Sequence, residues 1–370
     1  MRELALDNAS RTTTRVRPIC YVGPFPEPIH GQSITTIYLY HALRQAGLKV
    51  VKFDTGGGIG SNSSRVFRKL CVFCAAALWL FVHHRTTLYL SVHARGALPL
   101  TAALASLARL RGHDIFLHHH TRSHINCDDP RLSRLAKHAG DQAVHITICH
   151  AMSQMLRDAS NVVRHTAELS NIGAVDLPSE IAAGKVARPF TPRILGHMSN
   201  LTNEKGLGRV IEAFSVARAK GRVTRLIVAG PIHDRTAGAM IDKACRDFGE
   251  SFEWRGKVYG SQKASFFRDI DVFLFPSLYP DETQGIVNLE ALAAGVPVLA
   301  YENCCAVNDL QGPAAQCLPA NADFTAGLLE FLDTLNTEAP QYARARYESL
   351  LMENQTEILR LMNMMRRLAS

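Results

Sequence analysis

The chain has 370 residues, which is long for a single hydrophobic core, so we expect two domains. It is 47% hydrophobic and 20% charged, a composition typical of an α/β protein, and its formal net charge is +8. This surplus favours anionic partners such as nucleotides, phosphates, acidic glycans or an anionic membrane surface, but not nucleic acid, because aromatic residues make up only 7% and do not alternate with basic ones.

Apolar strands alternate with helical patterns through the first half of the chain. A strand is expected at 17–23 and a helix at 33–47, with a Pro- and Gly-rich loop between them. Further strands are expected at 49–58, 87–92, 114–120 and 145–149. This alternation predicts a parallel, doubly wound sheet.

A second series of strands follows a segment rich in Gly, Pro and small residues. Its strands are expected at 193–199, 225–231, 252–258, 271–277 and 296–302. We therefore predict two Rossmann-like domains, 1–175 and 193–340, joined by a linker at 176–192 and facing a central cleft. A C-terminal helical segment occupies 341–370, and packing back on the N-terminal domain is one option for it.

The longest apolar run, residues 70–82, is too short to cross a bilayer. Arg68 and Lys69 precede it and Arg85 follows it. Two interpretations remain open: a buried helix of an α/β domain, or a helix lying on an anionic membrane surface. The first twenty residues contain no apolar segment typical of a signal peptide, so we expect a cytoplasmic protein, with peripheral contact to the inner membrane face as an option.

Nine cysteines without a signal peptide predict reduced thiols. Cys71 and Cys74 form a C-x-x-C motif, but the motif lies inside the apolar run, so we expect core cysteines. The adjacent Cys304 and Cys305 have no metal-ligand spacing. The segment "DID" (269–271) imitates a metal-binding D-x-D, but Asp271 is expected to open a buried strand, and no metal is expected.

Two carboxylates lie around the start of a predicted helix in "PDETQGIVNLEALAAGVPVLA" (280–300). Glu282 is in a loop, and the helix is expected to begin near Gly285 or Ile286. The free N–H groups and the dipole of that helix favour an anion or a row of hydroxyls. Glu290 lies inside the helix, where burying a carboxylate is costly unless ligand hydroxyls donate to it. A capping acid and a surface glutamate are the alternative interpretation.

Two further positions predict an anion in the same cleft. Lys205 is expected at the beginning of a helix, beside Gly206, where a cation meets the positive end of the helix dipole unless an anion lies between them. In the other domain, Gly31 leads into a helix N-terminus, which is a favourable geometry for phosphate.

These motifs together resemble the GT-B glycosyltransferases of family 4. They are the Gly loop after the first strand, "EKG" (204–206), "VFLFPS" (272–277) and the E-x7-E segment that leads into "ALAAGVPV". The resemblance covers most of the chain and is strongest over 193–302. It implies a retaining, metal-independent enzyme that uses a nucleoside diphosphate sugar and no other cofactor.

The resemblance also implies roles for single residues. Glu290 would bind the ribose hydroxyls, Glu282 would hold hydroxyls of the donor sugar, and Lys205 would neutralise the departing diphosphate. Gly31 would approach the diphosphate from the N-terminal domain. The remaining donor contacts would be Asn200 and the backbone around Thr283, Gln284, Gly285 and Ile286.

A histidine often ends a strand of the first domain beside the reacting carbon in this family. The tract "HHHTRSH" offers His118, His119 and His120, of which His120 best matches the family loop. We expect His120 to be catalytic, with His119 and Arg122 on the acceptor side. A partly exposed, polar strand end is the alternative interpretation.

The chain departs from the family at one position. Asn200 stands where the family commonly has an arginine, and Asn cannot supply a guanidinium fork. Either a subgroup uses Asn, or Arg122, Arg209 or Arg255 serves as the second cation.

The resemblance implies transfer of a sugar, most simply a hexose, to a hydroxyl of a glycan or lipid-linked acceptor in surface polysaccharide or glycolipid assembly. A GT-B epimerase or phosphorylase and a catalytically inactive GT-B subunit are the alternatives. The sequence does not identify the nucleotide base, the donor sugar, the acceptor or the oligomeric state.

Overall fold

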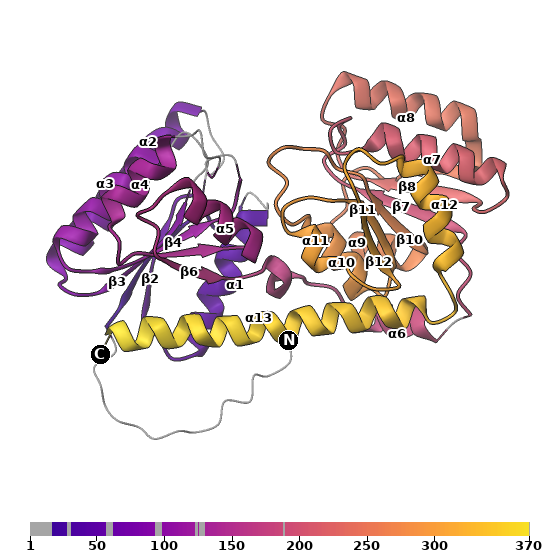
Figure 1. Ribbon diagram of the computed structural model, residues 1–370. Coiled ribbons are helices and arrows are strands. Elements are labelled where there is room, and N and C mark those ends of the chain that lie inside the picture. The colour runs from indigo at the N-terminus through magenta and orange to yellow at the C-terminus, as the bar shows by residue number, and fades with distance from the viewer. Residues whose placement is uncertain are drawn as a thin grey trace.

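The computed structural model describes residues 17–27, 31–56, 62–92, 98–122, 125, 130–187 and 189–369. Residues 1–16, most of the segment in which no signal peptide was recognised, lie outside these ranges. The chain forms two α/β domains side by side, with one long helix running beneath both (Figure 1). The predicted fold class, two Rossmann-like domains facing each other, is confirmed.

The N-terminal domain is built on a six-stranded parallel sheet with the order β2-β1-β3-β4-β5-β6. Its strands are β1 (Ile19–Gly23), β2 (Val50–Asp54), β3 (Thr87–Val92), β4 (Asp114–His119), β5 (Val144–Thr147) and β6 (His165–Glu168). Its helices are α1 (Gly31–Gln45), α2 (Asn62–Val82), α3 (Leu98–Leu110), α4 (Pro130–Ala139) and α5 (His150–Ala159).

The C-terminal domain is built on a second six-stranded parallel sheet, with the order β12-β11-β10-β7-β8-β9. Its strands are β7 (Ile194–Met198), β8 (Arg225–Ala229), β9 (Phe252–Trp254), β10 (Val272–Phe275), β11 (Val298–Tyr301) and β12 (Ala315–Leu318). The helical elements of this half are α6 (Ser179–Val186), α7 (Leu207–Ala219), α8 (Arg235–Phe248), η3 (Gly249–Ser251), α9 (Gly260–Asp269), α10 (Ile286–Ala293), α11 (Ala306–Asp309), α12 (Phe324–Thr334) and α13 (Ala339–Ala369).

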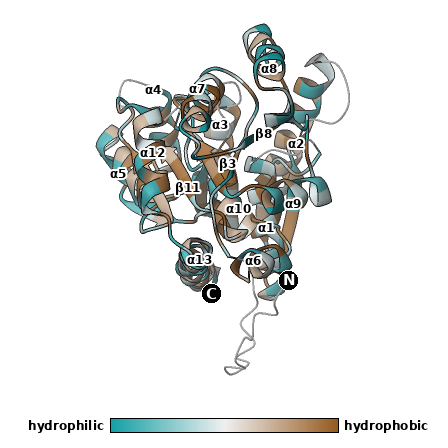
Figure 2. Ribbon diagram, turned by 90° about the vertical axis from the view of Figure 1, so that its right-hand side faces the viewer, coloured by the Kyte–Doolittle hydropathy of each residue, from teal (hydrophilic) through white to brown (hydrophobic). Residues whose placement is uncertain are grey.

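Both sheets are covered by helices on their two faces, because successive residues of a strand point to opposite sides. In β10, Val272 and Leu274 join one apolar cluster, whereas Phe273 and Phe275 join the other. The hydropathy colouring accordingly shows apolar strands inside and helices with polar outer faces (Figure 2). This arrangement places the carboxyl ends of the parallel strands, and the loops that follow them, where ligands of such sheets bind.

The connection between the domains is more structured than a plain linker. The short 3-10 helix η2 (Asn171–Ala174) precedes α6, which lies within the expected linker 176–192. Ile181 and Ala182 of α6 are buried, and Ile181 joins the apolar cluster of the C-terminal domain. The small residues of this segment therefore form a packed helix.

Helix α13 contacts both domains. Ala343 and Tyr347, near its start, belong to a core cluster of the C-terminal domain. Leu361 and Met365, near its other end, belong to a cluster of the N-terminal domain, beneath which the C-terminus lies (Figure 1). The helix is therefore a second connection between the two halves.

Helix α2 contains the apolar run and is only half-buried. Phe73, Ala76 and Leu80 pack into the N-terminal core, as the buried-helix interpretation requires. The opposite face carries exposed apolar side chains, among them Phe67 at 68% and Phe81 at 58%. No helix in the described ranges is long and apolar enough to cross a membrane.

Two expectations about the cysteines are wrong. Cys149 and Cys305 form a disulfide, so the nine cysteines are not all reduced thiols; the two are 156 positions apart and meet only through the packing of the domains. Cys71 and Cys74 are exposed instead of lying in the core, because three residues along a helix keep both on the outer face of α2.

Candidate functional site

The loop before α10 lies against the N-terminal domain. The hydroxyl of Thr283 donates to the carbonyl oxygen of His120 over 3.5 Å. The Gln284 side chain is almost fully buried, donates to Ser170 Oγ at 2.7 Å and accepts from the N–H of Asn171 at 3.0 Å. The two domains therefore meet at the segment where the sequence predicts donor binding.

The start of α10 is as predicted. The helix begins at Ile286, and Gly285 precedes it with a left-handed φ of 64°. A Cβ on Gly285 would lie 2.9 Å from Nδ2 of Asn288 and 3.0 Å from the Phe275 ring, so both backbone angle and space require glycine. The first N–H groups of a helix are unpaired within it, and this terminus can receive an anion or hydroxyls.

Lys205 and Glu282 form an ion pair at this site. Nζ of Lys205 lies 2.5 Å from Oε2 of Glu282, and both side chains are largely buried. The ammonium also lies 4.3 Å from the centroid of the Tyr279 ring, and Ser277 Oγ donates to the same carboxylate oxygen at 3.3 Å. Two of the three residues predicted to be catalytic are therefore in direct contact.

The turn that presents Lys205 depends on the next residue. Gly206 caps the N-terminus of α7 with φ 91°, and a Cβ there would lie 2.4 Å from the carbonyl oxygen of Pro276. The "EKG" segment thus packs directly against the end of "VFLFPS". This close approach holds the lysine next to the loop that carries Glu282.

Glu290 is buried and paired with a lysine that the sequence did not single out. Its Oε1 lies 2.5 Å from Nζ of Lys263, on α9. Burial raises the pKa of the Glu290 carboxyl, Lys263 lowers it and Asp176 raises it again. The carboxylate therefore lies inside the domain with a cation already in contact, and the interpretation as a surface glutamate is wrong.

The three adjacent histidines have different surroundings. His118 is fully buried, with Nδ1 2.6 Å from the hydroxyl of Tyr89, and burial lowers its pKa to about 3. His119 is also fully buried, with Nε2 3.0 Å from Nδ1 of His145. His120 follows β4, is partly exposed and lies at the contact with Thr283.

The remaining predicted donor contacts come from both domains. Gly31 is the exposed first residue of α1, and Asn200 is exposed in the loop after β7. Ile286 opens α10 and is partly buried. The structure brings Lys205, Glu282 and Thr283 together. Glu290 lies in α10, the helix that begins at Ile286.

The three candidate cations differ in their partners. Arg255 is held by Glu253 at 2.7 Å and by Asp269 at 2.8 Å, so its charge is already balanced. Arg209 lies over the Tyr301 ring, with its Cζ 5.9 Å from the centroid. Burial raises the pKa of the Cys304 thiol in the other domain, and the positive charge of Arg122 opposes this rise, so Arg122 lies near Cys304.

Both carboxylates of "DID" have structural partners. Asp271 accepts from the backbone N–H groups of Arg193 and Ile194, each at 2.9 Å, directly before β10. Asp269 pairs with Arg255. Asp271 therefore opens a strand, as predicted.

Sequence reasoning missed three polar residues beside the site. Lys263 pairs with Glu290, and His197 is fully buried between the carbonyl of Leu274 and Ser199 Oγ, each at 2.9 Å. Burial lowers the pKa of His197 to about 4, so it is neutral at pH 7. The Asn288 amide is buried beside Gly285, and neither of its atoms has a hydrogen-bond partner within the described residues. Only the polarity of Asn288 inside an apolar helix was a sequence signal.

Comparisons with known proteins agree with this architecture. Residues 179–332 match the family model "Glycosyl transferases group 1". A segment of 109 residues is 29% identical to the alpha-monoglucosyldiacylglycerol synthase of Streptococcus pneumoniae, and it spans 29% of this chain and only 23% of that protein.

Solved structures extend the likeness to both domains. The crystal structure of a glycosyltransferase from Rickettsia africae has a TM-score of 0.70 at 14% identity and covers 96% of this chain and 99% of that one. The structure of Anabaena HepE in complex with UDP-glucose has a TM-score of 0.62 at 17% identity and covers 93% and 99%. The chain therefore has the GT-B fold, and its C-terminal half carries a region that matches the group 1 glycosyl transferases.

Proposed function

We propose that this protein is a retaining glycosyltransferase of family 4 that moves a sugar from a nucleoside diphosphate to an acceptor hydroxyl. The observation that carries the proposal is the pair of lysine–glutamate contacts around α10. One pair, Lys205–Glu282, lies before the helix N-terminus, and the other, Lys263–Glu290, lies within the domain. A cation, a carboxylate and a helix N-terminus together suit a ligand with both phosphates and hydroxyls.

The donor would lie along α10. Its diphosphate would lie between the N-terminus of this helix and Lys205, which stabilises the negative charge that grows as the leaving group departs. Its ribose would reach Glu290, and its sugar would reach Glu282. Because these groups supply the positive potential, we propose that transfer needs no metal and no cofactor beyond the sugar nucleotide.

The reacting carbon would lie near His120, where the N-terminal domain meets the donor loop. Glu282 is held in an ion pair with Lys205, which makes it a poor nucleophile. We therefore infer transfer on the same face of the sugar, without a covalent intermediate on that carboxylate. The N-terminal domain would hold the acceptor, with Arg122 beside it.

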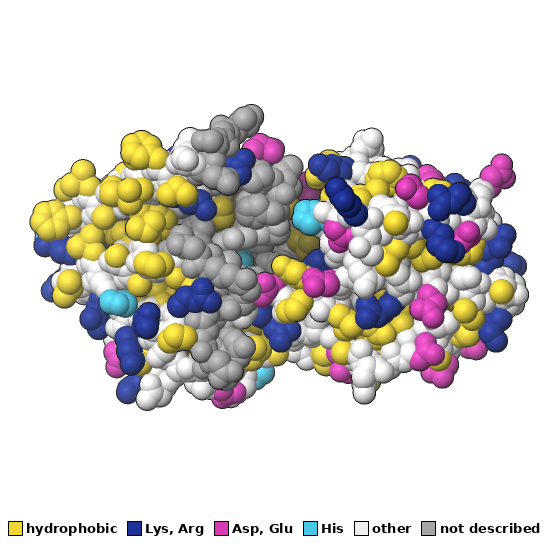
Figure 3. Space-filling view, turned by 90° about the horizontal axis from the view of Figure 1, so that it is seen from above, with side chains coloured by type: hydrophobic (Ala, Val, Ile, Leu, Met, Phe, Trp, Pro, Cys, Tyr) yellow, Lys and Arg dark blue, Asp and Glu magenta, His cyan; other side chains and the backbone are white. Residues whose placement is uncertain are grey.

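A lipid-linked acceptor is favoured by the outer face of α2. This basic apolar surface, as we call it, consists of the exposed apolar residues of that face and the neighbouring basic ones, namely Val66, Phe67, Leu78, Phe81, Val82, Arg65, Arg68 and Lys69. Hydrophobic side chains gather over the N-terminal domain, on the left of the space-filling view (Figure 3). A helix of this type binds to anionic lipid headgroups, so we propose a peripheral protein of the cytoplasmic membrane face.

The donor is the first point to test. Thermal shift with UDP, GDP, ADP and their sugars should identify one base, because a ligand at 100 times its Kd adds about 2.7 kcal/mol of stability. Slow hydrolysis of the matching sugar nucleotide, unaffected by EDTA, supports the transferase. Stable binding without any turnover supports the inactive subunit, which Asn200 in place of the family arginine favours. Epimerised sugar nucleotide, or sugar phosphate formed with added phosphate, supports an epimerase or phosphorylase.

A further inference from the structure

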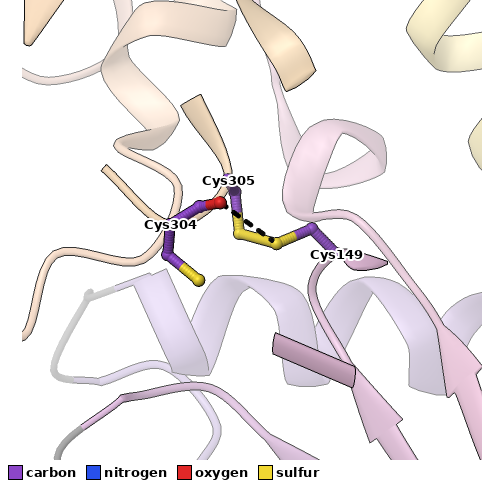
Figure 4. A group of neighbouring side chains, drawn as sticks. All are labelled: Cys149, Cys304 and Cys305. Atoms are coloured by element: carbon purple, nitrogen blue, oxygen red, sulfur yellow. Dashed lines mark hydrogen bonds between the residues drawn. A yellow bond between two sulfur atoms is a disulfide. The ribbon is translucent and has the colours of Figure 1, made fainter. Parts of the chain in front are cut away.

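Three cysteines meet at the boundary between the domains (Figure 4). Cys149 lies between β5 and α5 of the N-terminal domain, and Cys304 and Cys305 lie between β11 and α11 of the C-terminal domain. Their sulfur atoms all lie within 4.8 Å of one another, and a disulfide joins Cys149 to Cys305. The bond therefore links the two domains covalently.

The three cysteines differ in their access to solvent. Cys305 is fully buried and Cys149 is 8% exposed. Both belong to one apolar cluster, whose other buried members are residues of the N-terminal domain. Cys304 is only half-buried, and its sulfur lies 4.0 Å from Sδ of Met155. In the arrangement seen here, a reagent from solution therefore reaches Cys304 first.

The bond is connected directly to the proposed donor site. The backbone N–H of Cys305 donates to the carbonyl oxygen of Thr283 at 2.9 Å. Thr283 follows Glu282 and in turn contacts His120 of the other domain. Opening the domains would separate Cys149 from Cys305 and break the contact of Thr283 with His120.

We propose that Cys149 and Cys305 form a redox-reversible clamp that holds the two domains together and is set by small-molecule disulfides such as glutathione disulfide. Cys304 attacks the small disulfide and releases one thiol. Cys149 then attacks the Cys304 sulfur and releases the second thiol, and Cys305 attacks Cys149 and restores the Cys304 thiol. Two protein thiols and one small disulfide thus become one protein disulfide and two small thiols.

The expected consequence is slower exchange of ligands. Donor entry and product release in a two-domain enzyme require the domains to separate, and a covalent bond between them prevents this. The effect on sugar transfer rests on the proposed function, whereas the bond and its effect on domain separation do not.

The test begins with the full-length protein in reduced and oxidised form. After incubation with glutathione disulfide, non-reducing peptide mapping should identify the Cys149–Cys305 link, and dithiothreitol should remove it. Small-angle scattering without nucleotide should give a larger radius of gyration for the reduced protein than for the oxidised protein. If the transferase activity is present, kcat should fall about ten-fold on oxidation and recover on reduction.

Cysteine variants test whether the Cys149–Cys305 bond, and no other cysteine, causes the change in radius of gyration. Cys149→Ala and Cys305→Ala should show no oxidation-dependent change in radius, whereas Cys304→Ala should still form the link, but more slowly. Cys245→Ala, at an exposed cysteine on α8, is the control and should behave like the parent protein.

Three results would overturn the proposal. The first is a map without the Cys149–Cys305 link after oxidation, and the second is an equal radius for the two forms of the parent protein. The third is stoichiometric zinc in the purified protein, lost in all three cluster variants, because that would make the cysteines a metal site.

Discussion

The ammonium of Lys205 lies 2.5 Å from the carboxylate of Glu282, although the residues are 77 positions apart in sequence. Without a ligand, each charge is therefore neutralised by the other. A diphosphate would compete with Glu282 for the lysine, and sugar hydroxyls would compete with Lys205 for the glutamate. Donor binding would therefore replace the Lys205–Glu282 ion pair with a contact between Lys205 and the diphosphate and a contact between Glu282 and the sugar.

This relationship separates the roles of the two glutamates. Glu290→Gln should raise the Kd of the bare nucleoside diphosphate about ten-fold or more, since a lost hydrogen bond to a charged group costs about 1.5–3 kcal/mol. Glu282→Gln should leave that Kd unchanged or lower it, because Lys205 is released, yet it should reduce kcat. Calorimetry beside a turnover assay measures both. Equal weakening of nucleotide binding by the two variants would contradict this assignment.

The buried Lys263–Glu290 pair should matter for stability. Lys263→Met leaves a buried carboxylate without its cation, and we expect a loss of about 2–4 kcal/mol in the free energy of unfolding at pH 8. The loss should be smaller at pH 5 than at pH 8, because burial raises the pKa of this carboxyl and lower pH favours its neutral form. Denaturant titrations at the two pH values provide the measurement. Lys243→Met, which removes an exposed pair with Asp247, is the control and should change little.

Asp309 gives the protein a defined pH dependence. It is buried and accepts from Gln284 Nε2 at 2.8 Å, and burial raises its pKa from 3.8 to about 6. The folded protein therefore holds a proton that the unfolded chain has lost, so the contribution of Asp309 to stability falls as pH rises from about 4 to about 6. A shift of about 2 units corresponds to about 3 kcal/mol. Asp309→Asn should lose this part of the pH dependence, and identical slopes in parent and variant between pH 4 and 7 would refute it.

The end of α13 should stabilise the N-terminal domain. Leu361 is buried in the core cluster of that domain, whereas Leu359, two positions earlier, is 44% exposed. Leu361→Ala should cost about 2–4 kcal/mol, and Leu359→Ala about 0.5 kcal/mol or less. Both values can be read from the unfolding transition of the N-terminal domain. Equal effects would mean that the helix end does not pack as described.

The basic apolar surface of α2 should bind anionic vesicles. Phe67→Ser and Phe81→Ser should each reduce cosedimentation with vesicles that contain phosphatidylglycerol, and added salt should weaken binding by the parent protein, because headgroup attraction is screened. Met352→Ser on α13 is the matched control, since Met352 and Phe67 are both 68% exposed. Unchanged binding by both Phe variants would exclude α2 as the contact.

The sequence carried the signals for most of the fold, because the central strands are short apolar runs followed by turn residues. The two strands that it did not reveal, β6 and β12, lie at sheet edges. Each has four residues with partly exposed positions, so neither leaves a clear apolar run. A strand at a sheet edge is less buried than a central strand, so its sequence shows a weaker apolar pattern.

The candidate site was visible where it depends on local motifs and hidden where it depends on long-range packing. Glu282, Gly285 and Glu290 lie around a helix start that the sequence itself indicates, after an apolar strand and a polar loop. Lys263 is on a separate helix, and its pairing with Glu290 has no local signature. Cys149 and Cys305 are likewise brought together only by the contact between domains.

When the Cys149–Cys305 bond is reduced, two connections between the domains determine how they can move. The chain passes from one domain to the other through η2, which touches both α1 and α10, and returns along α13. Two bodies joined at two separate places cannot slide past each other or twist freely. The easiest remaining motion of the two domains is rotation about the line through both connections. Their relative motion therefore has essentially one degree of freedom. A single distance across the domain boundary, such as that between positions 149 and 305, would then report the whole movement.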